Sequence, residues 1–342
     1  MFLIRNILVI ITMIFASYSA YAEQANESAI FTANEGSKSI TMVNTVTKTS
    51  VSAKTSIMPH NVQITPDGKY ILATGMPADH EGMNHEEMAK MSGKLVVINT
   101  QDFEKGVVSE VEIGQHPAHV VTNIAGNMAY VTDSGANNIA VVDLKTMEVK
   151  NHIATGNFPH GIRMSHDGKK FYVANLKGGS ISVIDAGEEK SIAEVAVGKT
   201  PIQVCISVDD KYVYVSLAGE NSVTVVDTNS LTVIKKIKVG NFPAQVFTDP
   251  KGRYVYVVNQ GTENKPDNTI SVIDTKNNEV VKTIETGLMA HGIVTSDDGD
   301  FIYVTNMLEG NVSVIDSANL EHIEKLSVGS KPNGITFVSK IN

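Results

Sequence analysis

The chain has 342 residues, of which 42% are hydrophobic and 19% are charged, and its formal net charge is −9. This apolar fraction excludes wholesale disorder, and the acidic balance argues against a nucleic-acid partner, which needs a basic face. A single Cys excludes an internal disulfide and Cys-rich zinc modules, while thirteen Met in a chain without Trp is an unusual bias.

Residues 1–22 have the pattern of an export signal. Arg5 supplies a positive charge, residues 7–15 form an apolar run too short to span a bilayer comfortably, and 20–22 give a small–x–small cleavage site. We expect cleavage after Ala22 and a periplasmic or secreted mature chain, and an uncleaved anchor is the alternative. No later segment is long and apolar enough to cross a membrane.

A repeat of 42 residues occupies the rest of the chain. Its anchors, usually a Pro, lie at positions 59, 117, 159, 201, 243, 290 and 332, with insertions of 16 residues in the first unit and 5 in the fifth. The unit at 159 contains alternating runs at 161–165, 171–174, 181–185 and 192–197, and an Asp-Gly pair supplies its first turn. Four strands per unit at this period predict a β-propeller.

The two ends of the repeat complement each other. Residues 30–33, 40–43 and 46–53 resemble the last three strands of a unit, whereas the unit from Pro332 has a first strand alone. We therefore expect an all-β, seven-bladed propeller with four-stranded antiparallel blades, closed when the C-terminal strand joins the N-terminal three. It forms a single domain over residues 23–342, and because closure removes exposed edges we expect a monomer.

Four short motifs carry a family resemblance. YVTD at 130–133, YVTN at 303–306, PDGK at 66–69 and SVID at 182–185 resemble the YVTN β-propeller repeat family. The resemblance covers nearly the whole mature chain and implies the propeller fold. It implies no single function, because similar propellers include surface-layer proteins, the d1-haem domain of a periplasmic nitrite reductase and the propeller domain of nitrous-oxide reductase.

The first strand of each propeller unit lines the central channel, and His residues gather at its start. Imidazole is a common ligand of copper, zinc and haem iron, so several on one face indicate a metal or haem site. The alternative for each is a structural hydrogen bond, and for each Met it is apolar packing. The candidates at or beside the anchors are His60, His116, His119, His160, His291, Met58 and Met289.

The 16-residue insertion, at 76–91, adds a second group of candidates between the second and third strands of its unit. Thioether sulfur favours Cu(I) and imidazole accepts either copper redox state, so this composition suits copper. The run DHEGMNHEEM also resembles the Met/His-rich segments of periplasmic copper-handling proteins. The alternative is a flexible lid or partner-binding loop. We expect the insertion on the same face as the channel-mouth His residues, with His80, Met83, His85, Met88 and Met91 as ligands.

These patterns support three functions. The first is a metal-binding chaperone, buffer or resistance factor, with copper favoured over zinc and a periplasmic metal donor or acceptor protein as partner. The second is a propeller that binds d1-type haem or another redox cofactor, with His160 or His119 as axial ligand; covalent c-type haem is excluded because no CxxCH is present. The third is an envelope interaction scaffold. No nucleophile arrangement is recognisable, so we predict no catalytic residue.

Overall fold

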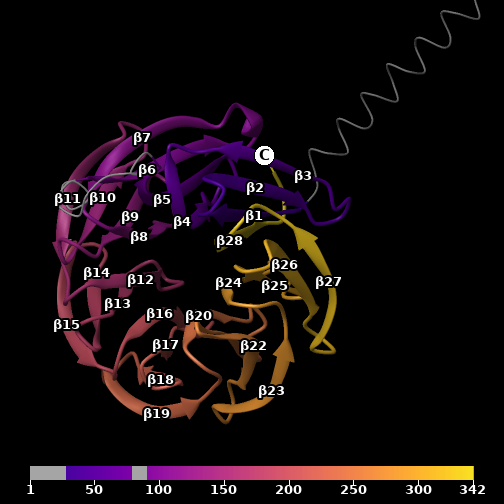
Figure 1. Ribbon diagram of the computed structural model, residues 1–342. Coiled ribbons are helices and arrows are strands. Elements are labelled where there is room, and N and C mark those ends of the chain that lie inside the picture. Colours follow the sequence, from indigo (N-terminus) through magenta and orange to yellow (C-terminus); the bar gives the residue numbers. More distant parts are fainter. Residues whose placement is uncertain (1–27, 79–90, 342) are drawn as a thin grey trace, which may run out of the picture.

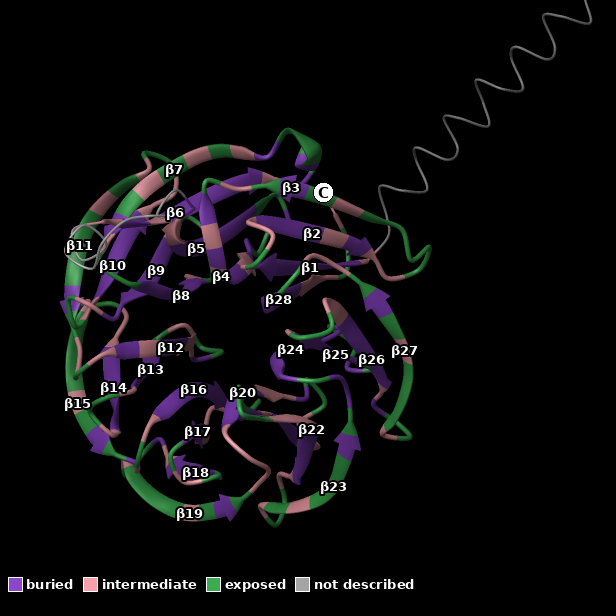
Figure 2. Cartoon of the chain, in the orientation of Figure 1, coloured by how far each residue is buried: buried purple, intermediate pink, exposed green. Residues whose placement is uncertain are grey.

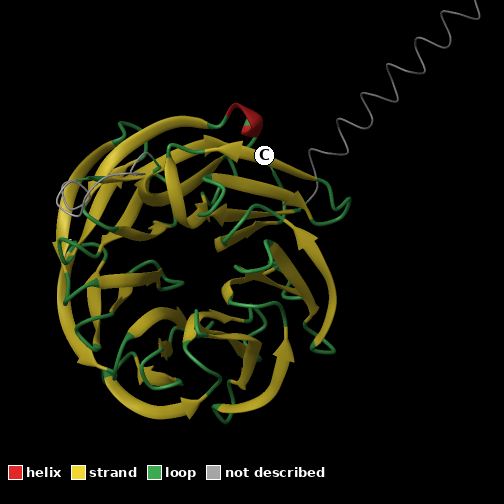
Figure 3. Cartoon of the chain, viewed as in Figure 1, coloured by secondary structure: helices red, strands yellow, loops and turns green. Residues whose placement is uncertain are grey.

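The computed structural model describes residues 28–78 and 91–341. Seven four-stranded antiparallel sheets form a ring around a central channel (Figure 1), which confirms the predicted seven-bladed propeller. Strands dominate, and within the described ranges the one helix is a short 3₁₀ turn, η1 (Phe103–Lys105) (Figure 3). No helix in this part of the chain has the length and hydrophobicity of a membrane span.

Each blade is built from one strand along the channel and three progressively farther out. From the channel outward, the blades are β28 (Pro332–Val338), β1 (Ala29–Asn34), β2 (Ser39–Asn44), β3 (Ser50–Lys54); β4 (Ile57–Ile64), β5 (Tyr70–Pro77), β6 (Gly93–Asn99), β7 (Val107–Gly114); β8 (Pro117–Thr122), β9 (Met128–Asp133), β10 (Asn138–Asp143), β11 (Glu148–Ala154); β12 (Pro159–Met164), β13 (Lys170–Asn175), β14 (Ser180–Asp185), β15 (Lys190–Ala196); β16 (Pro201–Ile206), β17 (Tyr212–Leu217), β18 (Ser222–Asp227), β19 (Thr232–Lys238); β20 (Pro243–Thr248), β21 (Tyr254–Thr262), β22 (Lys265–Asp274), β23 (Glu279–Glu285); and β24 (Ala290–Thr295), β25 (Phe301–Asn306), β26 (Asn311–Asp316), β27 (Glu321–Ser327).

The ring closes as the ends of the repeat predicted. β28 pairs antiparallel with β1, so the last strand of the chain completes the blade that the first three strands begin. This pairing within one blade joins the two ends of the repeat and closes the ring.

The hydrophobic core lies between the faces of neighbouring blades. The cluster that contains Ile40 and Ile71, for example, joins the closing blade to the blade of β4–β7. Burial decreases outward, so the outermost strands expose most of their side chains while the inner three are mostly buried (Figure 2). Alternating apolar side chains therefore pack neighbouring blades against each other. The channel-facing side chains of the innermost strands do not take part in this packing.

Four of the turns that follow channel strands share one design, in which a Ser or Thr hydroxyl donates to an Asp two residues later. In the blade of β12–β15, Gly168 has φ 72°, a conformation that favours glycine. The Ser165 hydroxyl donates to Asp167 Oδ1, and that carboxylate accepts the Lys169 backbone N–H at 3.0 Å. The Lys169 hydrogen bond is the main cause of the lowered pKa of Asp167, about 2. Such turns fix the hairpin register and hence the height of each residue along the channel.

Candidate functional site

The channel wall consists of equivalent positions from the seven channel strands. We call the end of the channel that carries the anchors the upper end. The upper ring contains the first residue after each anchor: His60, Ala118, His160, Ile202, Ala244, His291 and Asn333. The middle ring contains the second: Asn61, His119, Gly161, Gln203, Gln245, Gly292 and Gly334. The lower ring contains the fourth: Gln63, Val121, Arg163, Cys205, Phe247, Val294 and Thr336.

Four imidazoles gather at the upper end, as predicted. The ring centroid of His60 lies 5.4 Å from that of His160, 5.7 Å from His119 and 6.3 Å from His291. Nε2 of His60 and Nε2 of His160 are 3.3 Å apart. One ring nitrogen each from His60, His119 and His160 lies within 4.8 Å of the others. These separations are short enough for the three rings to contact a single metal ion.

Hydrogen bonds select the tautomers of the two rings at the mouth. His160 Nδ1 donates to the Ile202 carbonyl at 3.0 Å, so its Nε2 keeps a lone pair. Asn333 Nδ2 donates to His60 Nδ1 at 3.1 Å and to Glu35 Oε2 at 3.0 Å. His60 therefore carries its proton on Nε2, which points at His160 Nε2. A metal-binding histidine commonly donates its second N–H to a carbonyl in this manner, and His160 is held ready as a ligand.

The two most buried imidazoles, His119 and His291, differ in their surroundings. His119 is 1% exposed and lies between the amides of Gln203 and Gln245, at 3.3 and 3.4 Å from its two nitrogens. His291 is 7% exposed, and neither of its buried ring nitrogens has a hydrogen-bond partner in the described chain. Buried polar atoms without partners are rare in folded proteins, so His291 is a ring for which the protein itself supplies no partner.

Burial keeps all four rings neutral. Desolvation lowers the pKa of His60 to about 4 and is the main cause of the lowering for His160 and His291, each to about 3. The pKa of His119 is also well below its ordinary value, first through burial and then through the neighbouring His rings and Arg163. At neutral pH each ring therefore offers a lone pair, which is the state that binds a metal.

A hollow of about 190 Å³ opens above this cluster. Its wall includes His60, His160, Glu35, His116 and, on the apolar side, Met58, Met76 and Phe158. No Lys or Arg is among the described residues that line it. A ligand here meets imidazole nitrogen, thioether and aromatic surface rather than cations.

The remaining predicted ligands differ in where they lie. His116 and Met58 line the hollow, whereas Met289 is buried, with a left-handed backbone (φ 54°), and is not among the residues that line it. The insertion lies between β5 and β6 as predicted, but His80, Met83, His85 and Met88 are outside the described residues. Met91 is half-buried and has no described contact with the cluster. Metal binding by any of these residues stays a prediction.

A comparison with models of known protein families shows to which family this chain is related. The family model described as the cytochrome D1 heme domain matches residues 123–245 and 215–334, which together are more than half of the chain. The chain belongs to the cytochrome D1 haem domain family. This match is to the D1 haem domain and not to the YVTN repeat, so the resemblance to the YVTN family stays a prediction. No curated protein matches the sequence.

Solved structures share the fold of this D1-family chain. The hydrazine synthase of Kuenenia stuttgartiensis is 19% identical, with 81% of this chain and 88% of that chain covered and a TM-score of 0.69. The dihydro-heme d1 dehydrogenase NirN, in complex with DHE, is 13% identical, with 92% and 75% covered and a TM-score of 0.66. A protein of unknown function from Desulfotomaculum acetoxidans is 15% identical, with 90% and 98% covered and a TM-score of 0.73. At these identities the likeness concerns the fold alone.

The donor set of this D1-family propeller fits the iron of a haem. Haem iron is commonly held by one imidazole nitrogen. His160 lines the hollow, and its Nδ1 is fixed by a carbonyl, so that its lone pair is on Nε2, 3.3 Å from His60 Nε2. Neutral rings and the unpartnered nitrogens of His291 agree with a site designed for a metal-bearing group. The findings thus favour the haem hypothesis over the copper or zinc hypothesis.

Proposed function

We propose that this protein binds a haem of the d1 type at the upper end of its channel, with His160 as axial ligand. The observation that carries the proposal is the hydrogen bond from His160 Nδ1 to the Ile202 carbonyl, which puts the lone pair of His160 on Nε2. That nitrogen accepts a hydrogen bond from His60 Nε2 at 3.3 Å, which an axial bond to iron would replace. The D1 domain match supports a d1-type group, and NirN, a similar propeller, is described in complex with DHE. We propose that the protein acts in the periplasm, as the signal-like residues at its N-terminus predict.

The residues around His160 have separate tasks in this proposal. When bound, a haem supplies redox and ligand-binding chemistry. His60 holds a proton on Nε2 at the mouth, where Asn333 and Glu35 orient it. Met58, Met76 and Phe158 exclude water from one side of the hollow. Since no described Lys or Arg lines the hollow, affinity depends mainly on the iron–imidazole bond.

A bare metal ion is the second candidate. The convergence of His60, His119 and His160 nitrogens within 4.8 Å favours it, because three imidazoles suit zinc or copper. In that function the protein would receive the ion from, or deliver it to, another exported protein.

A spectroscopic titration tests the proposal. The purified protein is titrated with d1-type haem, and binding is followed through the absorption bands and their shift on axial ligation. We expect His160→Ala to weaken binding by about 100-fold or more, because the axial bond is lost. His152→Ala is the matched control, since His152 lies exposed on outer strand β11 and should leave the titration unchanged.

Two outcomes would contradict this function. Equal affinity of the His160→Ala variant would remove His160 as the ligand. No haem binding, together with one equivalent of Cu(I) or Zn²⁺ bound and lost in His60→Ala and His119→Ala, would replace the haem with a metal ion.

A further inference from the structure

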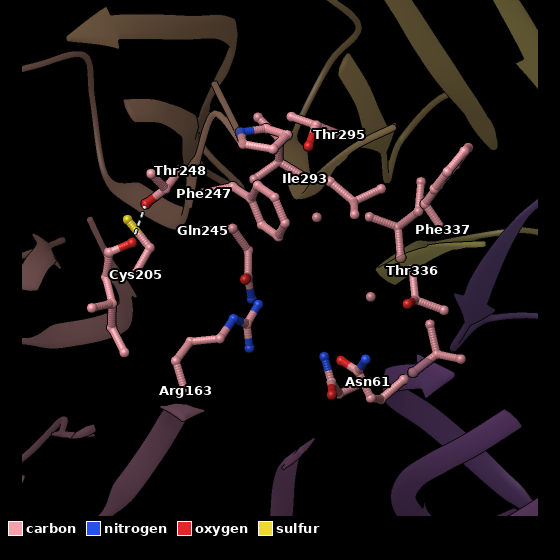
Figure 4. A pocket seen from close by; sticks show the side chains of 18 of the residues that line it. Asn61, Arg163, Cys205, Gln245, Phe247, Thr248, Ile293, Thr295, Thr336 and Phe337 are labelled. Atoms are coloured by element: carbon pink, nitrogen blue, oxygen red, sulfur yellow. Dashed lines mark hydrogen bonds between the residues drawn. The ribbon is translucent and has the colours of Figure 1, made fainter. Parts of the chain in front are cut away.

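A second, larger cavity lies at the lower end of the channel. Its volume is about 390 Å³, within the range of small-molecule sites. Six of the seven lower-ring residues line it, and Asn61 and Gln245 of the middle ring line it as well. Figure 4 shows Arg163, Gln245, Asn61 and Phe247 directed into this one space.

The middle ring lies between this cavity and the upper hollow, and no described residue lines both. Gln203 Nε2 donates to Gln245 Oε1 at 3.1 Å, and both amides contact His119. Gly161 makes room for this arrangement, since a Cβ there would lie 2.2 Å from Gln203 Oε1. The lower cavity is therefore a compartment of its own and not an extension of the upper hollow.

Arg163 is the single Arg or Lys among the described residues that line the lower cavity. Its Nη1 donates to the Ile162 carbonyl at 2.9 Å, and within residues 28–78 and 91–341 it forms no ion pair with Asp or Glu. Arg253, by contrast, pairs with Asp249, with Nε 2.7 Å from Oδ2. Burial lowers the pKa of Arg163, yet a guanidinium stays charged in proteins. Arg163 is half-buried, and a partly desolvated charge without an ion-pair partner is stabilised by an anion.

The other charges around the cavity do not neutralise Arg163. Cys205 is a neutral thiol, because burial raises its pKa to about 12. Asp297 is exposed at the rim, and the ring of His166 is 2.7 Å from its own carboxylate partner, Asp210. The fixed positive charge of Arg163 is therefore available to a ligand.

The rest of the wall indicates what the anion looks like. Phe247, Val294 and Ile335 give the cavity an apolar side, while Thr295 and Thr336 add hydroxyl groups. A planar guanidinium fork matches the two oxygens of a carboxylate. We propose that the lower cavity binds a small organic carboxylate, which pairs with Arg163 and packs its apolar body against Phe247 and Val294.

Calorimetric titration with sodium benzoate tests this site, with neutral benzamide as the isosteric control. Benzoate should bind and benzamide should bind at least tenfold more weakly, because it lacks the charge. Arg163→Gln should weaken benzoate binding at least tenfold. Lys169→Gln removes an equal charge from an exposed turn at the same end and should leave the affinity unchanged. His160→Ala should also retain benzoate binding, which separates this test from that of the haem site.

Two further measurements keep the proposal falsifiable should Arg163→Gln fail to fold. Arg163→Lys keeps the charge without the planar fork and should give weakened but measurable benzoate binding. Phe247→Ala should weaken benzoate more than acetate, because acetate has little apolar body to lose. Equal binding of benzoate and benzamide, or undiminished affinity in both Arg163 variants, would overturn the proposal.

Discussion

The two ends of the channel are built from the same seven strands but carry opposite chemistry. The upper end presents four imidazoles that burial keeps neutral, and the lower end presents one guanidinium that stays charged. Arg163 follows His160 by three positions on β12. The blade packing sets where a side chain enters the channel, and the residue type alone decides whether that level suits a metal or an anion.

Acid should distinguish the two ends most strongly. His60, His160 and His291 have folded-state pKa values of about 4, 3 and 3, below the unfolded value near 6.5. The unfolded chain therefore binds more protons than the folded one below pH 6.5, and stability falls as the pH decreases. With about 1.4 kcal/mol per unit of pKa shift, we expect the ligand-free protein to lose a few kcal/mol between pH 6.5 and about 4.

Urea unfolding at several pH values measures this loss. The triple variant His60→Gln, His160→Gln, His291→Gln should show a flatter dependence over the same interval. An equally steep dependence in that variant would assign the acid sensitivity to the carboxylates instead. Arg163 contributes nothing in this range, because its charge does not change.

The second prediction concerns the layer of Gln203 and Gln245 between the two ends of the channel. Gly161→Val would drive its side chain into Gln203 Oε1 and the Ile202 carbonyl, which a Cβ would approach to 2.2 and 2.6 Å. We expect a destabilisation of about 1–3 kcal/mol and weaker binding at both ends, as for other overpacked sites. Thermal unfolding and both titrations measure it. Gly187→Val, at an exposed outer turn, is the control, and loss of binding at one end alone would show that the partition is not shared.

Asn333→Ala should have the smallest effect and should affect one end. It removes the hydrogen bond to His60 Nδ1, worth about 0.5–1.5 kcal/mol, and frees the His60 ring to change tautomer. We expect up to tenfold weaker haem binding and unchanged benzoate binding. The ¹⁵N chemical shifts of the His60 ring report the tautomer, and an unchanged tautomer would mean that Asn333 does not control it.

The fold could be predicted from the sequence because the repeat spacing and the complementary ends left one arrangement. The gathering of His60, His119, His160 and His291 at one end also followed from the repeat. The sequence did not predict which residues share a level of the channel, which tautomers the His rings adopt, or that the Gln203 and Gln245 amides lie between its two ends. Most channel strands have a register shift after the anchor, as between Pro159 and Ile162, so the first and second residues after it both face the axis. In a strand without this shift, side chains alternate between the two faces, so one of these two residues would point away from the axis. For this reason the sequence did not indicate that Gln203 and Gln245 face the channel.

Arg163 went unnoticed for a different reason. One basic residue in a strand has no spacing pattern, and its meaning depends on the absence of a carboxylate nearby, which only the assembled ring reveals. The insertion ligands His80, Met83, His85 and Met88 lie outside the described residues, so the copper hypothesis for that loop stays a prediction.

The closing blade ties the upper site to the order of folding events. His60 on β4 takes its tautomer from Asn333 on β28, which is 273 residues away along the chain. Contacts between such distant segments form late, because bringing the segments together costs chain entropy. A ring in which β28 has not yet paired with β1 therefore lacks the bond from Asn333 that orients His60 toward His160. Only the closed ring presents the two imidazoles in this arrangement. Cofactor loading would then act as a maturation checkpoint, since unfinished propellers would be left empty.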